Sequence, residues 1–174
     1  FGDADADSIA AAFERFGTAQ LVVKPQISAG SDRTVRLARG DPPVSLPAAI
    51  LQPYLPAIVE EGELSLLYVD GAFSHAVRKR ARADDFRCQP QYGGTLSLAE
   101  PLPGWRAVAG QALAALPAPP LYARVDLIRL ADGSAAVMEV EAIEPDLYAD
   151  LAPDVADRLA AAIARRVLKN GDCP

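Results

Sequence analysis

Cysteine, histidine, methionine and tryptophan are all scarce in this 174-residue chain, which has two Cys, one His, one Met and one Trp. Cys88 and Cys173 cannot build a disulfide framework, and they do not have the spacing of a zinc site. With His75 as its single histidine, the chain has no partner set for a Ser–His or Cys–His nucleophile. On an apolar strand, one histidine is more typical of a core residue than of a metal ligand.

Long apolar runs and an excess of positive charge are also missing. No stretch approaches the roughly 18 apolar residues that cross a bilayer, and the start has no signal-peptide pattern. We therefore expect a cytoplasmic protein without a membrane partner. The formal net charge is −6 and the sequence pI is about 4.8, which disfavours a nucleic-acid partner. Of the 17 cationic residues, 14 are Arg, which binds anions well. Local anion-binding pockets are therefore compatible with the net negative charge.

The remaining composition is that of a folded chain, with 51% hydrophobic and 23% charged residues. The length suits one domain or slightly more, with a real core. The chain opens Phe1-Gly2-Asp3 without Met, and we expect it to be part of something longer.

Turn residues divide the chain into two modules. In the first, Ser8 is expected to cap a helix to about Phe16, and strands 20–24 and 34–37 flank a small-residue loop. Residues 51–56 read as an extended crossing segment. The second module has two hairpins with Asp-Gly turns, over 63–79 and 121–143. Helices are expected over 105–116 and 155–168.

The second hairpin carries the most informative pattern. A two-residue turn at Asp132-Gly133 places Asp126 opposite Glu139 and Arg124 opposite Glu141, all on one face. Three carboxylates on one small patch need a cation, and oxygen-only ligands suit Mg or Mn. Glu144 adds a fourth carboxylate just past the strand. The alternative is a solvated acidic face with Arg124 as a structural partner.

The first hairpin is expected to place Glu63 opposite Arg78 and Leu66 opposite His75. Ser28, Ala29, Gly30 and Ser31 form a loop whose N–H groups suit a phosphate. The P-loop signature is missing from it. Each nearby cation (Lys24, Arg78, Arg87) taken singly reads as a surface charge. Together with a magnesium-type patch, they indicate a bound nucleoside triphosphate.

The order of these segments resembles that of ATP-grasp enzymes of the glutathione-synthetase-like branch. The resembling segments are Val22-Val23-Lys24-Pro25 with Ser28-Ala29-Gly30, Gln52-Pro53-Tyr54-Leu55, Asp85-Phe86-Arg87 with Gly93-Gly94, Arg124-Val125-Asp126, and Met138-Glu139-Val140-Glu141. Residues 73–79 and 143–145 are similar to a bacterial subgroup that contains the cyclo-ligase of cycloserine biosynthesis. The resemblance covers about residues 8–168.

The resemblance implies an α+β ATP-grasp fold. Residues 1–52 would form part of the small nucleotide-covering lobe, 53–56 the hinge, and 57–174 the larger antiparallel-sheet lobe with the metal site. It also implies a set of site residues. These are Lys24, Ser28, Ala29, Gly30 and Ser31 for the phosphates; Gln52, Pro53, Tyr54 and Leu55 for adenine; Glu63 and Arg78 for the rest of the nucleotide; Arg87 and Arg124 for catalysis; and Asp126, Glu139 and Glu141 for Mg or Mn.

The implied activity is that of an ATP- and Mg-dependent carboxylate–amine or cyclo-ligase that acts through an acyl phosphate. Its partners would be ATP, a small carboxylate substrate and a nitrogen nucleophile, and self-association is left open. Relatives carry an N-terminal substrate domain, so we expect this chain alone to lack useful turnover. Glu141 stands where most relatives carry Asn, and Ser65 replaces an Arg of the ribosomal-protein glutamate ligases. The alternatives are a nucleotide-binding or interaction module without turnover, and a purely structural acidic domain.

Overall fold

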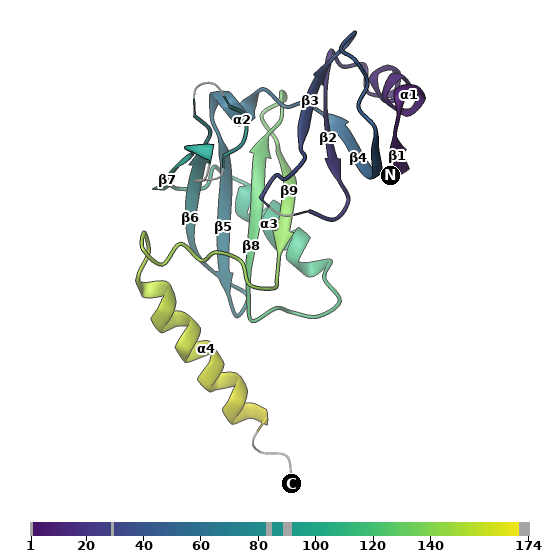
Figure 1. Ribbon diagram of the computed structural model, residues 1–174. Coiled ribbons are helices and arrows are strands. Elements are labelled where there is room, and N and C mark those ends of the chain that lie inside the picture. Colours follow the sequence, from purple (N-terminus) through teal and green to yellow (C-terminus); the bar gives the residue numbers. More distant parts are fainter. Residues whose placement is uncertain (1, 29, 83–84, 89–91, 171–174) are drawn as a thin grey trace. The chain divides into compact units, whose positions relative to one another are not determined.

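The computed structural model describes residues 2–28, 30–82, 85–88 and 92–170 (Figure 1). These fall into two units, residues 1–56 and 57–174, and each is described by itself. Both are α+β with antiparallel sheets, as predicted. No helix among the described residues is long and apolar enough to cross a membrane.

Among its described residues, the first unit has one helix and a four-stranded sheet of order β1-β4-β2-β3. Its elements are β1 (Gly2–Ala4), α1 (Ala6–Phe16), β2 (Gln20–Pro25), β3 (Val35–Ala38) and β4 (Leu46–Pro53). The predicted crossing segment is therefore wrong in part, because residues 51–53 end a strand that pairs with β2.

Helix α1 begins three residues before the predicted start, because Asp5 and not Ser8 is its N-cap. The Asp5 carboxylate accepts a hydrogen bond from the Ser8 N–H at 2.8 Å, and the Ser8 hydroxyl accepts one from the Asp5 N–H at 2.9 Å. This reciprocal capping box satisfies two backbone donors at the helix start. The helix ends after Phe16, as predicted, and Gly17 follows it in the left-handed region.

In the part of the second unit that the structure describes, three helices accompany a five-stranded antiparallel sheet of order β7-β6-β5-β8-β9. Its elements are α2 (Ala57–Glu60), β5 (Glu63–Val69), β6 (Ala72–Arg80), β7 (Thr95–Leu98), α3 (Trp105–Ala114), β8 (Tyr122–Arg129), β9 (Ala135–Glu141) and α4 (Asp154–Asn170). Trp105 and Ala109 of α3 pack on Leu64, Leu66 and Val125, so α3 covers one face of this sheet.

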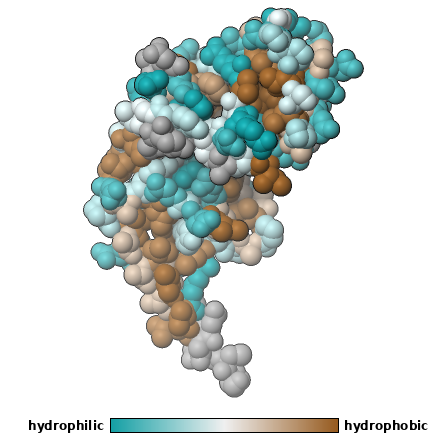
Figure 2. All heavy atoms as spheres, viewed as in Figure 1, coloured by the Kyte–Doolittle hydropathy of each residue, from teal (hydrophilic) through white to brown (hydrophobic). Residues whose placement is uncertain are grey.

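The other face of the same sheet carries Leu67, Val77 and the side chain of Tyr148, together with the polar residues described below. Figure 2 shows hydrophobic side chains gathered along α4, where Ile163 and Val167 are exposed.

His75 lies on this second face and is fully hydrogen-bonded. Its Nε2 lies 3.1 Å from the Leu147 carbonyl, which can only accept, so Nε2 carries the proton. The Ser74 hydroxyl, 3.0 Å from Nδ1, then donates to that nitrogen. Burial lowers the pKa of His75 below its usual value. His75 is therefore a structural tie between β6 and the segment that carries Tyr148.

Candidate metal centre

Three carboxylates from β8 and β9 meet on the open face of the second sheet. Asp126 lies opposite Glu139, and Arg124 lies opposite Glu141, as the sequence pattern predicts. One oxygen from each of Asp126, Glu139 and Glu141 lies within 4.8 Å of the others. Asp126 is fully buried, Glu141 is half-buried and Glu139 is exposed. The predicted grouping on one face is confirmed.

The turn that was expected to set this register is nevertheless wrong. The Leu130 N–H donates to the Ser134 carbonyl at 2.8 Å, so the loop has one residue more than the predicted two-residue turn. A bulge between Asp126 and Leu127 then shifts the register back, with Met138 as the extra residue of β9. The two deviations cancel, and the carboxylates end opposite each other.

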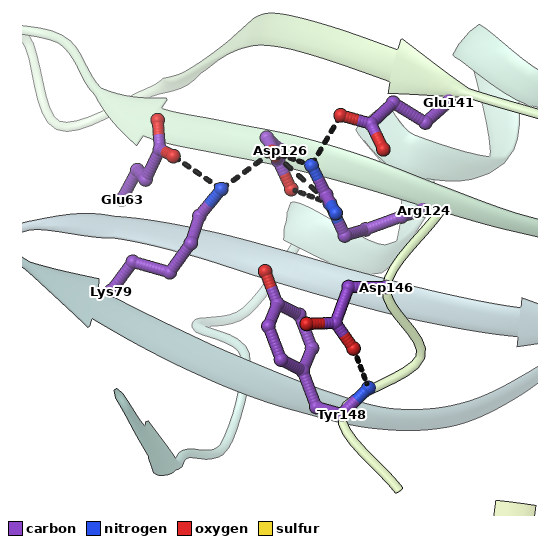
Figure 3. A network of polar contacts seen from close by, with 7 residues as sticks. All are labelled: Glu63, Lys79, Arg124, Asp126, Glu141, Asp146 and Tyr148. Atoms are coloured by element: carbon purple, nitrogen blue, oxygen red, sulfur yellow. Dashed lines mark hydrogen bonds and ion pairs between the residues drawn. The ribbon is translucent and has the colours of Figure 1, made fainter. Parts of the chain in front are cut away.

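Two cations hold the buried carboxylate. Arg124 Nε lies 3.0 Å from Asp126 Oδ1, and Arg124 Nη2 lies 3.1 Å from Asp126 Oδ2. The same Nη2 also contacts Glu141 Oε1. Lys79 Nζ lies 2.7 Å from Asp126 Oδ2 and also pairs with Glu63 (Figure 3). Both oxygens of Asp126 therefore accept charge-assisted hydrogen bonds.

Lys79 stands where Arg78 was predicted, because β6 has a bulge. The extra residue is Ser74, so Glu63 pairs with Lys79, Leu66 with Ala76, and Leu67 with His75. The predicted register of this hairpin is wrong by one residue beyond the bulge. Alternation places Arg78 on the opposite face, where its Nη1 donates to the Glu61 carbonyl at 3.0 Å. Lys79 is thus a residue that the sequence analysis missed.

The titration of this cluster follows from burial and pairing. Burial alone would lower the pKa of Lys79, but Glu63 and Asp126 outweigh it and raise that pKa above its usual range. Burial opposes ionisation of Asp126, yet Lys79 and Arg124 hold its pKa below the usual value. Burial is the largest influence on Glu63 and raises its pKa, with Lys79 acting against it and the Asp126 carboxylate acting with it. The ion pairs thus favour an ionised Asp126.

The donor set fits a hard divalent cation. Its ligand atoms are all carboxylate oxygens, which Mg and Mn prefer. Directly opposite Asp126 on β5 lies Ser65, whose buried hydroxyl interacts with the Asp126 carboxylate and with Tyr148. The fit to a divalent ion therefore rests on the carboxylate donor set.

Tyr148, also missed from the sequence, closes this cluster from below. Its backbone is in the left-handed region, with φ of 51°, and its N–H donates to Asp146 Oδ1 at 2.7 Å. In Figure 3 its hydroxyl points toward the Lys79–Asp126 contact. Burial raises the pKa of Tyr148, while Lys79 and Arg124 act in the opposite direction. It follows an irregular segment after β9, where no periodic pattern marks a functional side chain.

Gly62 lets β5 begin directly beside β6, and Gly62→Ala is expected to destabilise the fold. Gly62 has φ of 78°, and an added Cβ would lie 2.1 Å from the Lys79 carbonyl oxygen. We expect the free energy of unfolding to fall by about 2–3 kcal/mol in urea titrations. Gly133→Ala is the matched control, because Gly133 has φ of 85° and nothing within 4 Å. An equal loss in both variants would contradict the close-approach argument.

Cys88 is expected to resist alkylation in the native protein. It is 3% exposed, and burial, with the nearby Glu63 carboxylate second, raises its pKa to about 11. Thiolate is the reactive form, so iodoacetamide at pH 8 should react at least about 100-fold more slowly than with the urea-unfolded chain. The measurement uses Cys173→Ser to leave one thiol. Equal rates in the folded and unfolded chains would contradict the burial of this thiol.

In the first unit, Lys24 and Gln52 share the sheet face that points away from α1. Leu21 and Val23 of β2 pack with α1, so Val22 and Lys24 face the other way. Strand β4 pairs Gln52 with Val22. The two predicted residues therefore lie on one surface of this unit.

The segment after β4 is fixed by Arg36 of β3. Arg36 Cζ lies 3.9 Å from the centre of the Tyr54 ring, and its Nη2 donates to Gln20 Oε1 at 2.7 Å. The Tyr54 N–H donates to the Gln20 carbonyl at 3.0 Å. Pro53 is the last residue of β4, and Leu55 follows outside regular structure. The predicted adenine-binding residues thus lie at one strand end.

The predicted phosphate loop has a tight local geometry. The Ser28 hydroxyl donates to the Asp32 carbonyl at 3.1 Å. Gly30 and Ser31 both have a positive φ, near 60°. Ala29 lies outside the described residues. The phosphate role of this loop stays a prediction.

Arg87 is held by its own loop. Its Nη2 lies 2.7 Å from Asp85 Oδ2, and its Cζ lies 3.7 Å from the centre of the Tyr92 ring. This pairing with Asp85 fits the alternative interpretation of Arg87 as a surface charge. Its phosphate role also stays a prediction.

No family model matches the chain. Over 125 residues, 68% of this chain and 42% of the relative, it is 38% identical to the cycloserine biosynthesis protein DcsG of Streptomyces lavendulae. The crystal structure of D-cycloserine synthetase DcsG matches 92% of this chain and 61% of that chain, with 32% identity and a TM-score of 0.75. The chain thus spans less than two thirds of the length of these relatives.

Two more distant structures share the fold. D-alanine–D-alanine ligase from Bacillus anthracis, complexed with ATP, matches 96% of this chain and 58% of that chain, with 19% identity and a TM-score of 0.57. The ATP-grasp ligase PsnB, complexed with a phosphomimetic variant of its minimal precursor, Mg and ADP, matches 91% and 51%, with 18% identity and a TM-score of 0.59.

Proposed function

Because this chain is a member of the ATP-grasp superfamily and is homologous to part of DcsG, we propose that it binds ATP with Mg²⁺ or Mn²⁺ in a cytoplasmic ligase. The ligase would join a small carboxylate substrate to a nitrogen nucleophile, in the same or another molecule. The observation that carries the proposal is the carboxylate cluster of Asp126, Glu139 and Glu141.

The proposed nucleotide contacts follow the segments that resemble those of ATP-grasp enzymes. Lys24 and residues 28–31 would contact phosphate oxygens, and residues 52–55 would contact adenine through backbone groups. Leu55 is the natural N–H donor, because the following Pro56 has none. Glu63 would accept from the ribose hydroxyls. The alternative for Glu63 is a structural ion pair, and in this structure its carboxylate pairs with Lys79.

The reaction has two transfers. A substrate carboxylate oxygen attacks the terminal phosphorus of ATP, ADP leaves, and an acyl phosphate forms. The nitrogen nucleophile then attacks the acyl carbon and phosphate leaves, which gives an amide-type bond. Both first reactants are anions, so Arg87 and Arg124 would hold them together and in line. A divalent ion at Asp126, Glu139 and Glu141 would supply further neutralisation of phosphate charge.

A second candidate function is nucleotide binding without turnover. The observation in its favour is that Lys79 and Arg124 already neutralise Asp126. Such a cluster is also what a purely structural ion-pair network looks like.

Titration with a fluorescent ATP analogue, with and without Mg²⁺, tests the proposal. We expect Mg²⁺ to tighten binding by at least about tenfold, or about 1.4 kcal/mol. Equal affinity with and without Mg²⁺ would favour the second candidate. No binding in either condition would contradict both.

A further inference from the structure

Arg124 forms ion pairs with two of the three carboxylates that a divalent ion would need. Its Nε and Nη2 contact both oxygens of Asp126, and Nη2 also reaches Glu141. The Arg124 side chain is 9% exposed, so this fork is packed between the two acids. The guanidinium therefore acts in this structure as the resident cation of the cluster.

The charge of the cluster favours binding of a divalent ion, but the geometry makes that ion compete with Arg124. Glu63 and the three clustered carboxylates together carry a formal charge of −4. Lys79 and Arg124 reduce this charge to −2, which one divalent ion matches. Yet Asp126 Oδ2 already accepts from Lys79 and Arg124, which uses both of its lone pairs. An ion on the same carboxylates would lie within a few ångströms of the guanidinium, where like charges repel strongly.

We infer that a divalent ion displaces Arg124 from Asp126 and Glu141, and that the released guanidinium then binds an oxyanion. The inference rests on the proposed function of this site. Its consequence is an order of binding, because the anion-binding residue becomes available only after the ion is in place. A carboxylate and a phosphate each present a pair of oxygens that can accept two parallel N–H bonds from the Arg guanidinium.

Glu141 and Tyr148 lie next to the Arg124 guanidinium, and Glu141 borders its way to solvent. Glu141 is the exposed side of the contact, with its side chain 36% exposed, so the guanidinium leaves past Glu141 toward solvent. The ring centre of Tyr148 lies 5.8 Å from Arg124 Cζ, within the range at which an aromatic face stabilises a cation. Tyr148 thus contacts the guanidinium from the buried side, while the way out lies on the side of Glu141.

Mn²⁺ titration of the chain and two charge-matched variants tests the competition. We expect Arg124→Gln to tighten Mn²⁺ binding by about tenfold or more, because it removes the competing cation. Arg129→Gln removes the same charge from the same strand, where Arg129 contacts Glu61, and should change the affinity by less than about twofold. Weaker binding in Arg124→Gln, or equal effects in both variants, would overturn the inference while leaving the metal site intact. No Mn²⁺ binding by any variant would overturn the proposed metal site as well.

A second measurement uses the unmodified chain and does not depend on the folding of a variant. The ¹⁵N signal of Arg124 Nε, assigned by through-bond correlation to its own backbone, should shift when Mg²⁺ is added. Inorganic phosphate and acetate, added separately, should shift it again only in the presence of Mg²⁺, and the two arms distinguish a phosphate from a carboxylate partner. A signal unmoved by saturating Mg²⁺ would overturn the inference.

Discussion

Replacing Glu139 by Gln is expected to lower the affinity for Mn²⁺ by at least about 100-fold, or about 2.7 kcal/mol. Glu139 provides one of the three clustered carboxylate oxygens and lies directly opposite Asp126. The amide keeps the size of the side chain and removes its charge. Because Glu139 is exposed, the free energy of unfolding should change by less than about 0.5 kcal/mol. The Mg²⁺-dependent gain in nucleotide affinity should disappear with the metal.

Glu144→Gln is the matched control for this prediction. Glu144 is an exposed carboxylate three residues after Glu141, and it is not part of the three-residue cluster. Calorimetric Mn²⁺ titrations of both variants should separate a specific loss from a general effect of net charge. Equal losses in both variants would argue for diffuse attraction by an acidic surface. An unchanged affinity in Glu139→Gln would remove Glu139 from the site.

Much of the fold follows from the sequence because its patterns are local. The Asp-Gly turns marked both hairpins of the second unit, and the small-residue loop separated two strands of the first. The resemblance to ATP-grasp enzymes is confirmed by the matches to DcsG and to more distant ligases. These features rest on turn chemistry and on the order of segments, which a single sequence contains.

The sequence did not predict the full strand register of the two hairpins in the second unit. Alternation predicts faces correctly only while strands pair without extra residues, and a bulge moves every later side chain to the other face. Ser74 moved Lys79 opposite Glu63 and removed Arg78 from that position. At Asp126 the error was hidden, because the longer loop and the Met138 bulge cancel. Neither bulge has a marker such as Gly or Pro in its strand.

The cations that organise the site also escape a pattern-based analysis. Lys79 lies within the run Arg78-Lys79-Arg80, which reads as a basic cluster on the surface, yet its side chain is 8% exposed. Its role depends on Asp126, a residue 47 positions away in the sequence. Only the three-dimensional pairing shows that one member of the run is buried among acids.

Replacing Lys79 by Met is expected to lower the free energy of unfolding by about 3–5 kcal/mol. Lys79 pairs with Glu63 and Asp126, and both acids are buried. Met fills a similar volume without charge, so Asp126 keeps Arg124 as its cation while Glu63 loses its Lys79 partner. Urea denaturation at pH 7 measures it. Arg80→Met, at an exposed position one residue later, should change the free energy by less than about 0.5 kcal/mol.

The pH dependence of the Lys79→Met deficit has a definite sign. In the parent chain the pKa of Lys79 is raised by folding. The stability that this shift contributes is lost only as pH rises through the pKa of Lys79 in the folded state. That contribution is therefore constant between pH 5 and 8, well below the usual lysine pKa of about 10.4. Without Lys79, the pKa values of Glu63 and Asp126 should rise, and the variant regains stability as these acids take up protons. The difference between variant and parent should narrow from pH 7 toward pH 5.

The double variant Glu63→Gln, Lys79→Met separates the ion-pair network from simple packing. If the cost of Lys79→Met comes from unpaired carboxylates, then removing the charge of Glu63 should restore about half of the lost stability. Glu63 is the acid whose pKa burial already raises, so it is the costlier one to leave charged and unpaired. If the double variant is as unstable as Lys79→Met alone, the loss comes from packing of the lysine stem. A Lys79→Met deficit below about 1 kcal/mol would mean that the cluster is hydrated and that Lys79 is an ordinary surface cation.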